Sequence, residues 1–256
     1  MTRCPWRLLE VGAFAGAELW EISPVLAETA AISVGEGAAP PTVVIRRQRP
    51  YALLGPRDER LPRLADGIRV LGQAGLSVFV RPSGGSAVIL DEGCLSFGVA
   101  RPCTDFTSIK RNFEELTEGV RRALGYLGLD ARFGEAPGSF CPGPYDLMVG
   151  RYKVAGIAQA MRGGYTLVSG MLLVSQDPVP VTRLLNAFYS AAGGPANLVP
   201  DNVAPLSTLL GRPVSMEEAE TALRRGFGDL YELETSVPSP VEFERARRLL
   251  AARRLA

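Results

Sequence analysis

The chain has 256 residues, of which 46% are hydrophobic and 21% are charged, and its formal net charge is +1. This size is compatible with one large α/β unit, and the balanced charge gives no indication of binding to nucleic acid or to a membrane surface. No apolar run is long enough to span a bilayer and the first residues lack a signal-peptide pattern, so we expect a cytoplasmic protein.

The amino acids that are missing exclude whole classes of site. The sequence contains no histidine, which excludes imidazole as a base and with it the Ser-His-Asp and Cys-His arrangements. The cysteines Cys4, Cys94, Cys103 and Cys141 are scattered without a Cys-x-x-Cys pair. We therefore expect neither a disulfide framework nor a metal site.

The first half of the chain alternates short apolar runs with helical patterns. Ser23 and Pro24 predict the start of a helix that ends near Gly35. Helical patterns also cover 62–74 and 107–127, the latter with apolar residues at intervals of three and four. Strands of a mixed sheet are predicted at 42–46, 51–54, 76–80, 86–90 and 95–100.

The second half begins with a predicted antiparallel meander. Its strands cover 145–149, 153–159 and 165–174 and are joined by tight turns. A helix is predicted over 180–192. Capping-box patterns at Ser215 and Ser239 then predict the starts of two C-terminal helices.

These elements predict an α+β fold, in which helices cover a mixed and largely antiparallel sheet. We expect a catalytic domain over 1–200 and a small helical C-terminal extension over 201–256 that packs on it.

Two segments are candidates for the functional site. The first is Arg-Pro-Ser-Gly-Gly-Ser-Ala-Val at 81–88, whose adjacent glycines leave backbone amides free for a ligand; a plain hairpin is the alternative interpretation. The second segment, 138–159, contains Cys141 on a glycine- and proline-rich loop and Lys153 at the start of a strand. Only Lys153 and Lys110 are lysines among 28 basic residues, which indicates that position 153 needs a lysine.

Together the two segments resemble a known family. The blocks Arg-x-Ser-Gly-Gly-x-Ala-Val-x-x-Asp at 81–91 and Lys-x-x-Gly-x-x-Gln at 153–159 are similar to the lipoate-protein ligase and octanoyltransferase family, which shares a fold with biotin ligases. Leu-Asp-Glu-Gly at 90–93 and Ser-Phe-Cys-Pro-Gly-Pro-Tyr-Asp-Leu at 139–147 resemble the branch that takes octanoyl groups from the glycine-cleavage H protein. The resemblance covers about 44–189.

The resemblance implies a sheet of the biotin/lipoate-ligase type and assigns roles to individual residues. Cys141 would accept the acyl group, and Lys153 would bind the acyl carbonyl. A tunnel for an eight-carbon acyl chain would be lined by Arg81, Ser83, Gly84, Gly85, Ala87, Gly156, Ile157 and Ala158.

The implied reaction is an amidotransfer in protein lipoylation. An octanoyl (lipoyl) group would pass from the H protein to a thioester on Cys141, and then to a lysine on a lipoyl domain of a 2-oxoacid dehydrogenase complex. The Lys153 ammonium would stabilise negative charge on the thiolate and on the oxyanion. Asp91 and Asp146 are expected to stabilise turns. We expect no cofactor, no metal ion, no nucleic acid and no membrane partner.

Three alternatives stay open. An octanoyltransferase that takes its acyl group from an acyl carrier protein would use the same cysteine. An ATP-dependent lipoate ligase would need no cysteine, and a non-catalytic paralogue would only bind lipoyl domains. Ser96 stands where related ligases often have Asn, and Ala160 and Met161 stand where two arginines are expected, which leaves partner docking open.

Overall fold

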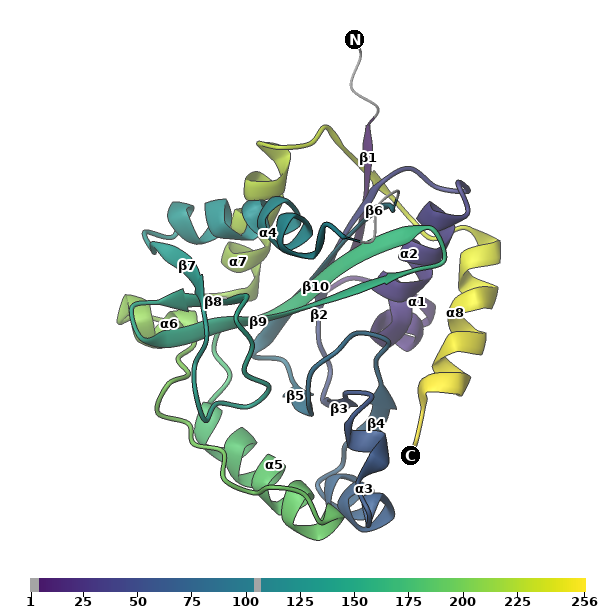
Figure 1. The fold of residues 1–256 in the computed structure, drawn as a ribbon. Helices are drawn as coiled ribbons and strands as arrows, with labels where there is room; N and C mark the ends of the chain where they lie inside the picture. The colour runs from purple at the N-terminus through teal and green to yellow at the C-terminus, as the bar shows by residue number, and fades with distance from the viewer. Residues whose placement is uncertain (1–4, 104–106) are drawn as a thin grey trace.

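The computed structural model describes residues 5–103 and 107–256, in which the strands form two sheets (Figure 1). The strands are β1 (Trp6–Val11), β2 (Thr42–Arg47), β3 (Tyr51–Leu54), β4 (Ser77–Val80), β5 (Val88–Leu90), β6 (Cys94–Pro102), β7 (Ala131–Gly134), β8 (Asp146–Val149), β9 (Tyr152–Arg162), β10 (Tyr165–Leu173) and β11 (Leu233–Ser236). The helices are α1 (Ala17–Ile22), α2 (Leu26–Gly35), α3 (Leu64–Gln73), α4 (Ile109–Tyr126), α5 (Pro178–Ala192), α6 (Leu206–Leu210), α7 (Met216–Gly228) and α8 (Pro240–Arg253), with 3-10 turns η1 (Ser23–Val25) and η2 (Asp58–Arg60).

The large sheet has eight strands in the order β11-β1-β2-β6-β10-β9-β8-β7. β1 pairs in parallel with β2 and with β11, and every other pair in this sheet is antiparallel. The α+β prediction of a mixed, largely antiparallel sheet covered by helices is confirmed, and the predicted meander is β8, β9 and β10.

β3, β4 and β5 form a separate three-stranded sheet in the order β4-β3-β5, whereas the sequence pattern predicted a single mixed sheet. Only three residues, 48–50, join β2 to β3, and they end in Pro50, which has no backbone N–H for a sheet ladder. The chain therefore leaves the large sheet at this point. Side chains of the two sheets face each other across the cavity described below.

Helices cover both faces of the large sheet (Figure 1). α4 and α7 pack on one face, where Phe113 and Phe227 join the core around Phe97. α2 and α8 lie on the other face, and α3 packs against α5 beside the small sheet. α4 confirms the helix predicted over 107–127, although Ile109 at its start is 49% exposed.

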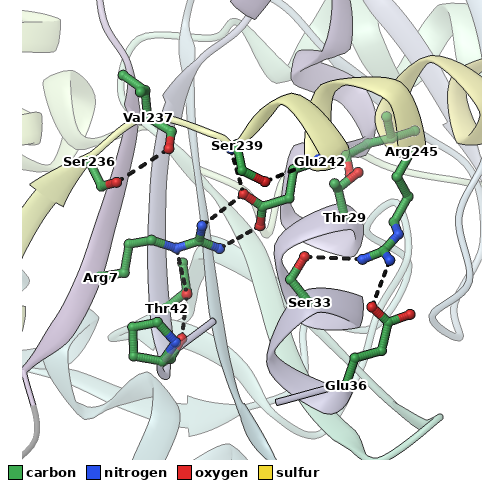
Figure 2. A network of polar contacts seen from close by, with 12 residues as sticks. Arg7, Thr29, Ser33, Glu36, Thr42, Ser236, Val237, Ser239, Glu242 and Arg245 are labelled. Carbon is green, nitrogen blue, oxygen red and sulfur yellow. Dashed lines mark hydrogen bonds and ion pairs between the residues drawn. The ribbon is translucent and has the colours of Figure 1, made fainter. Parts of the chain in front are cut away.

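α8 is attached to the N-terminal strand by buried polar groups (Figure 2). The Arg7 guanidinium donates two hydrogen bonds to the Glu242 carboxylate, at 2.8 and 2.9 Å. Glu242 also accepts from the Ser239 amide at 2.8 Å, which completes the predicted capping box at this helix start. Arg245 of α8 donates to Ser33 in α2 and to Glu36, which follows α2 directly. Hydrogen bonds therefore hold α8 to both β1 and α2.

The predicted helix start at Ser215 is confirmed without its full capping box, whereas the one at Ser23 differs from the structure. The Ser215 hydroxyl caps α7 by accepting from the Glu218 amide at 3.1 Å, but the Glu218 carboxylate pairs with Arg212 and leaves the capping box incomplete. Ser23 lies in the turn η1 and accepts no capping bond, because α1 already precedes it in the chain.

The C-terminal segment is closely integrated with the rest of the molecule. β11 forms the edge of the large sheet beside β1, and α7 packs on α4. The division of the chain near residue 200 stays a prediction. Among the described residues, no helix combines the length and the apolar character that a membrane crossing requires.

Candidate active site

Cys141 lies on the loop between β7 and β8 and has a strained backbone. Its φ of 47° is the single positive φ of a non-glycine residue in the described part of the chain. Such conformations persist where the surroundings hold them in place, and they cluster at functional sites. The Sγ atom accepts hydrogen bonds from the Ser86 amide at 3.2 Å and from Arg81 Nη2 at 3.4 Å. The thiol is therefore held against two donors that would stabilise its anion.

Lys153 lies in β9, directly behind the Cys141 loop. Its Nζ donates to the carbonyl oxygens of Phe140 at 3.1 Å and Cys141 at 2.8 Å, and it forms a 2.8 Å ion pair with Asp146. The Lys153 and Asp146 side chains are only 2% and 1% exposed. All three N–H groups of the ammonium are thus directed at acceptors, which fixes its position against the backbone of the Cys141 loop.

Asp146 was missed as a partner of Lys153 by the sequence analysis, which expected only a turn carboxylate. It does accept from the Gly143 amide in its turn, at 3.0 Å, but it also accepts from the Ile157 amide and pairs with Lys153. Burial raises the pKa of the Asp146 carboxyl, against the opposing charge of Lys153. Asp91 behaves as predicted, because it accepts from the Gly93 amide within its own turn.

Two glycines allow these groups to approach one another. Gly85 has a φ of +105°, and a Cβ placed there would lie 2.6 Å from the Cys141 Sγ. A Cβ on Gly156 would lie 3.3 Å from Cε of Lys153. Side chains at these positions would displace the thiol or crowd the ammonium, which explains why both motifs contain glycine here.

A cavity runs from Cys141 and Lys153 between the two sheets. Most of its wall is apolar, as is usual for sites that bind small molecules. Predicted site residues that line it are Arg81, Ser83, Cys141, Lys153, Gly156, Ile157 and Ala158. The remaining lining residues are Arg46, Leu53, Val88, Leu90, Ser96, Phe97, Phe140, Ser169, Gly170, Met171 and Leu173.

The other three predicted residues lie around this cavity. Gly84 and Gly85 line a groove on the outer side of Cys141, which also reaches Ile109 and Gln159. Ala87 is fully buried and is not among the residues that line the cavity. The structure therefore places the predicted residues in one region but distributes them over an inner cavity and an outer groove.

Tyr189 and Asp58 support the loop between β4 and β5, which contains Gly84 and Gly85. Neither residue was predicted from the sequence. The Tyr189 hydroxyl accepts from the Ala87 amide at 2.9 Å and donates to Asp58 at 3.1 Å, while Asp58 accepts from the Gly55 amide. Burial, followed by the charge of Asp58, raises the pKa of Tyr189, so this hydroxyl keeps its proton. The loop between β4 and β5 is thus fixed by a buried hydrogen-bonded chain.

Comparison with known proteins identifies the family. Residues 24–228 match the family described as the lipoyl protein ligase A/B catalytic domain. The octanoyl-[GcvH]:protein N-octanoyltransferase of Bacillus velezensis is 32% identical over 254 residues, which cover 94% of this chain and 88% of that protein. The protein of the same name from Exiguobacterium sibiricum is 36% identical over 201 residues, which cover 75% of this chain and 74% of its own.

A solved structure agrees with these relatives. A T. acidophilum protein assigned as a lipoate protein ligase, with bound lipoic acid, superimposes with a TM-score of 0.74 and 27% identity, covering 97% of this chain and 96% of its own. The resemblance inferred from the sequence motifs and the prediction of an acyltransferase are both confirmed. The chain belongs to the lipoyl protein ligase A/B catalytic domain family.

Proposed function

We propose that this protein is an octanoyl (lipoyl) amidotransferase that works through a thioester on Cys141. It would take the octanoyl group from the glycine-cleavage H protein and deliver it to lysines of lipoyl domains. The observation that carries the proposal is the position of the Cys141 thiol, which is hydrogen-bonded in the wall of a mostly apolar cavity that the buried Lys153 also lines. The names of the similar transferases support the choice of donor.

In the first step the Cys141 thiol gives up its proton, and the sulfur attacks the carbonyl carbon of the octanoyl-lysine amide on the donor. The carbon–nitrogen bond breaks, the thiol proton ends on the departing lysine amine, and an octanoyl thioester forms. In the second step the amine of an acceptor lysine attacks this thioester, and its proton returns to the sulfur. Two moderate barriers replace one high barrier, because a thioester is more reactive than an amide.

Lys153 would stabilise the oxyanion in both steps. Its ammonium already donates to two backbone carbonyls and to Asp146, so the acyl oxygen takes the place of one of those carbonyls. The Ser86 amide, which donates to the resting sulfur at 3.2 Å, is a further donor beside the reacting carbon. Donors that are fixed before the reaction stabilise developing charge without reorganising.

The outer groove is the proposed docking site for the lysine-bearing loop of each partner. It meets the cavity at Cys141 and is lined by Ile109, Met161 and Gln159, among others. Among the described residues, neither side-chain polar atom of Gln159 has a hydrogen-bond partner, although both are buried. Buried amides are normally bonded, so Gln159 is suited to contact a partner's main chain.

Intact mass spectrometry tests the proposal. The protein is incubated without ATP with octanoylated H protein or with octanoyl carrier protein, and with or without an acceptor lipoyl domain. We expect an adduct of octanoyl mass from the H protein, released by hydroxylamine, and octanoylation of the acceptor. Cys141→Ala should lose both signals, whereas Cys103→Ala, which removes another partly exposed thiol, should keep them.

Other outcomes would redirect the assignment. An adduct that forms only from octanoyl carrier protein would change the donor and keep the cysteine mechanism. Transfer that needs ATP and free acid, and that survives Cys141→Ala, would contradict the thioester and make the protein a ligase. Binding of lipoyl domains without any transfer would identify a non-catalytic paralogue.

A further inference from the structure

Arg46 lies in the wall of the cavity that contains Cys141 and is almost completely buried. It belongs to β2 in the large sheet, and the residue is 7% exposed. Guanidinium groups are rarely buried without an acidic partner, because the charge must be removed from water. The position of this charge in a mostly apolar cavity therefore requires an explanation.

The contacts of Arg46 are neutral and incomplete. Nη1 donates to the Ser23 carbonyl oxygen at 2.6 Å and to the Tyr51 hydroxyl at 3.1 Å, and it lies 3.5 Å from the Ser23 hydroxyl. Among the described residues, every hydrogen bond of the Arg46 guanidinium comes from Nη1, and none of its partners is a carboxylate. One edge of the guanidinium is anchored to the protein, and its other donors are unused.

The sheet register places Arg46 at the opposite end of the cavity from Lys153. Arg46, Ser96, Met171 and Gly156 are aligned on the neighbouring strands β2, β6, β10 and β9. Aligned residues point to the same face, and three strand spacings separate Arg46 from Gly156 by about 14 Å of backbone. Since Gly156 adjoins Lys153, the cavity has its reacting end at β9 and its distal end at β2.

An eight-carbon acyl chain fits this length. When extended it spans about 9 Å, since each carbon–carbon bond of about 1.5 Å advances the chain by about 1.25 Å. A chain whose carbonyl lies beside Lys153 would end over Ser96, within reach of a side chain extending from Arg46. Ser96, which is buried, also lines the cavity.

The chemistry at the distal end separates two acyl groups of equal chain length. An octanoyl chain ends in a methyl group, which would exclude water from the guanidinium and offer no acceptor in return. An oxidised lipoyl chain carries two sulfur atoms of a dithiolane ring in this position. These sulfurs are polarisable and accept weak hydrogen bonds, so they would compensate part of the lost hydration.

We infer that Arg46 is a specificity-determining residue, which makes the cavity favour lipoyl over octanoyl groups by contacting the dithiolane sulfurs. The inference rests on the proposed transfer reaction, and it concerns the acyl group that is moved rather than the chemistry of the movement.

A competition experiment tests this inference. Equal amounts of octanoylated and lipoylated H protein are mixed with the enzyme and an acceptor lipoyl domain, and the two acylated acceptors are quantified by mass. We expect the wild-type enzyme to transfer lipoyl about tenfold faster, which is the order of effect of one hydrogen bond to a charged group. Arg46→Met should reduce this ratio to about one, and Arg46→Lys should retain part of it.

Tyr51→Phe is the matched control, because it removes one anchor of Arg46 while the charge stays in the cavity. It should keep the preference for lipoyl. A wild-type enzyme that prefers octanoyl would overturn the inference, and so would an Arg46→Met variant with an unchanged ratio. The wild-type preference can be measured even if the variant does not fold. If the wild-type enzyme transferred neither acyl group, the result would instead contradict the proposed function.

Discussion

The attachment of α8 and the cavity that contains Cys141 use arginines in opposite ways. At the attachment, Arg7 is paired with both oxygens of Glu242, and Arg253 is paired with Glu28. In the cavity, Arg46 and Arg81 donate to backbone carbonyls, hydroxyls and the thiol, and no described carboxylate forms an ion pair with them. The paired arginines attach α8 to the rest of the fold, whereas the two arginines without a described counter-ion line the cavity.

The largest expected effect comes from removing the one buried lysine of the site. Lys153→Met should slow octanoyl transfer about 1000-fold, because it removes the fixed donor at the oxyanion. Lys153→Arg should also be strongly impaired, since the guanidinium is larger and its donors are differently arranged. Initial rates of transfer to a lipoyl domain would measure both effects.

Lys110 provides the control for this prediction, because it is the other lysine of the chain and its side chain is 76% exposed. Lys110→Met should transfer at the wild-type rate. A loss of less than tenfold for Lys153→Met, in protein that is folded by circular dichroism, would remove Lys153 from the mechanism.

Breaking the Lys153–Asp146 pair should have the next largest effect. Asp146→Asn leaves the Lys153 ammonium buried with only neutral acceptors, and we expect the free energy of unfolding in urea to fall by about 3 kcal/mol. Asp130→Asn removes an exposed partner of Arg132 and should change it by less than about 0.5 kcal/mol. Equal effects of the two substitutions would show that burial does not matter for this pair.

Glu242→Gln tests the attachment of α8 and should lower the free energy of unfolding without lowering the transfer rate. We expect a loss of about 2 kcal/mol at neutral pH, because Arg7 would keep only a neutral acceptor in a buried position. Transfer rates at saturating substrate should stay at the wild-type level. Reduced rates at a temperature where the variant is fully folded would contradict the separation of the two regions.

The pH dependence of the wild-type protein sharpens this prediction. Burial acts to raise the pKa of Glu242, but the hydrogen bonds from Arg7 and the Ser239 amide outweigh it, and the pKa is lowered overall. Because the pKa is lowered in the folded state, the carboxylate stabilises the fold fully above the ordinary glutamate pKa of about 4.3. This stabilisation is lost as the pH falls from that value through the lower pKa of the folded state. The stability difference between wild type and Glu242→Gln should therefore shrink in acid.

The smallest expected effects distinguish the complete helix cap from the incomplete one. Ser239→Ala removes a full capping box and should cost about 1 kcal/mol. Ser215→Ala removes one exposed hydrogen bond and should cost about 0.5 kcal/mol. Thermal unfolding would show both, and a larger loss for Ser215→Ala would contradict the assignment of the boxes.

Much of the fold could be predicted because its central elements carry strong periodic patterns. The helix over 107–127 and the meander of β8, β9 and β10 are long, and one side of each is buried. The strands that were missed, β1, β7 and β11, lie at or near the two ends of the large sheet and have four to six residues. Short edge strands are stabilised by their neighbours rather than by their own composition.

The candidate site was predictable where residues form a motif and not where the fold alone brings them together. Cys141, Lys153 and Gly156 stand close in sequence, and the structure places them in one cavity with Arg81. Arg46 offers no such signal, because Arg47 follows it and neighbouring strand residues point to opposite faces. Nothing in the sequence shows which of the two arginines faces the cavity.

The position of β1 has a consequence for how the chain folds. β1 lies between β2 and β11, and its residue Trp6 is paired with Leu233. This contact closes a loop that spans nearly the whole polypeptide, and the entropy of loop closure makes such distant contacts slow to form. The paired strands around the cavity that contains Cys141, such as β2 and β6, are much nearer to each other in the chain. We therefore expect the cavity to assemble before the outer edge of the sheet closes, with faster amide hydrogen exchange in β11 than in β10.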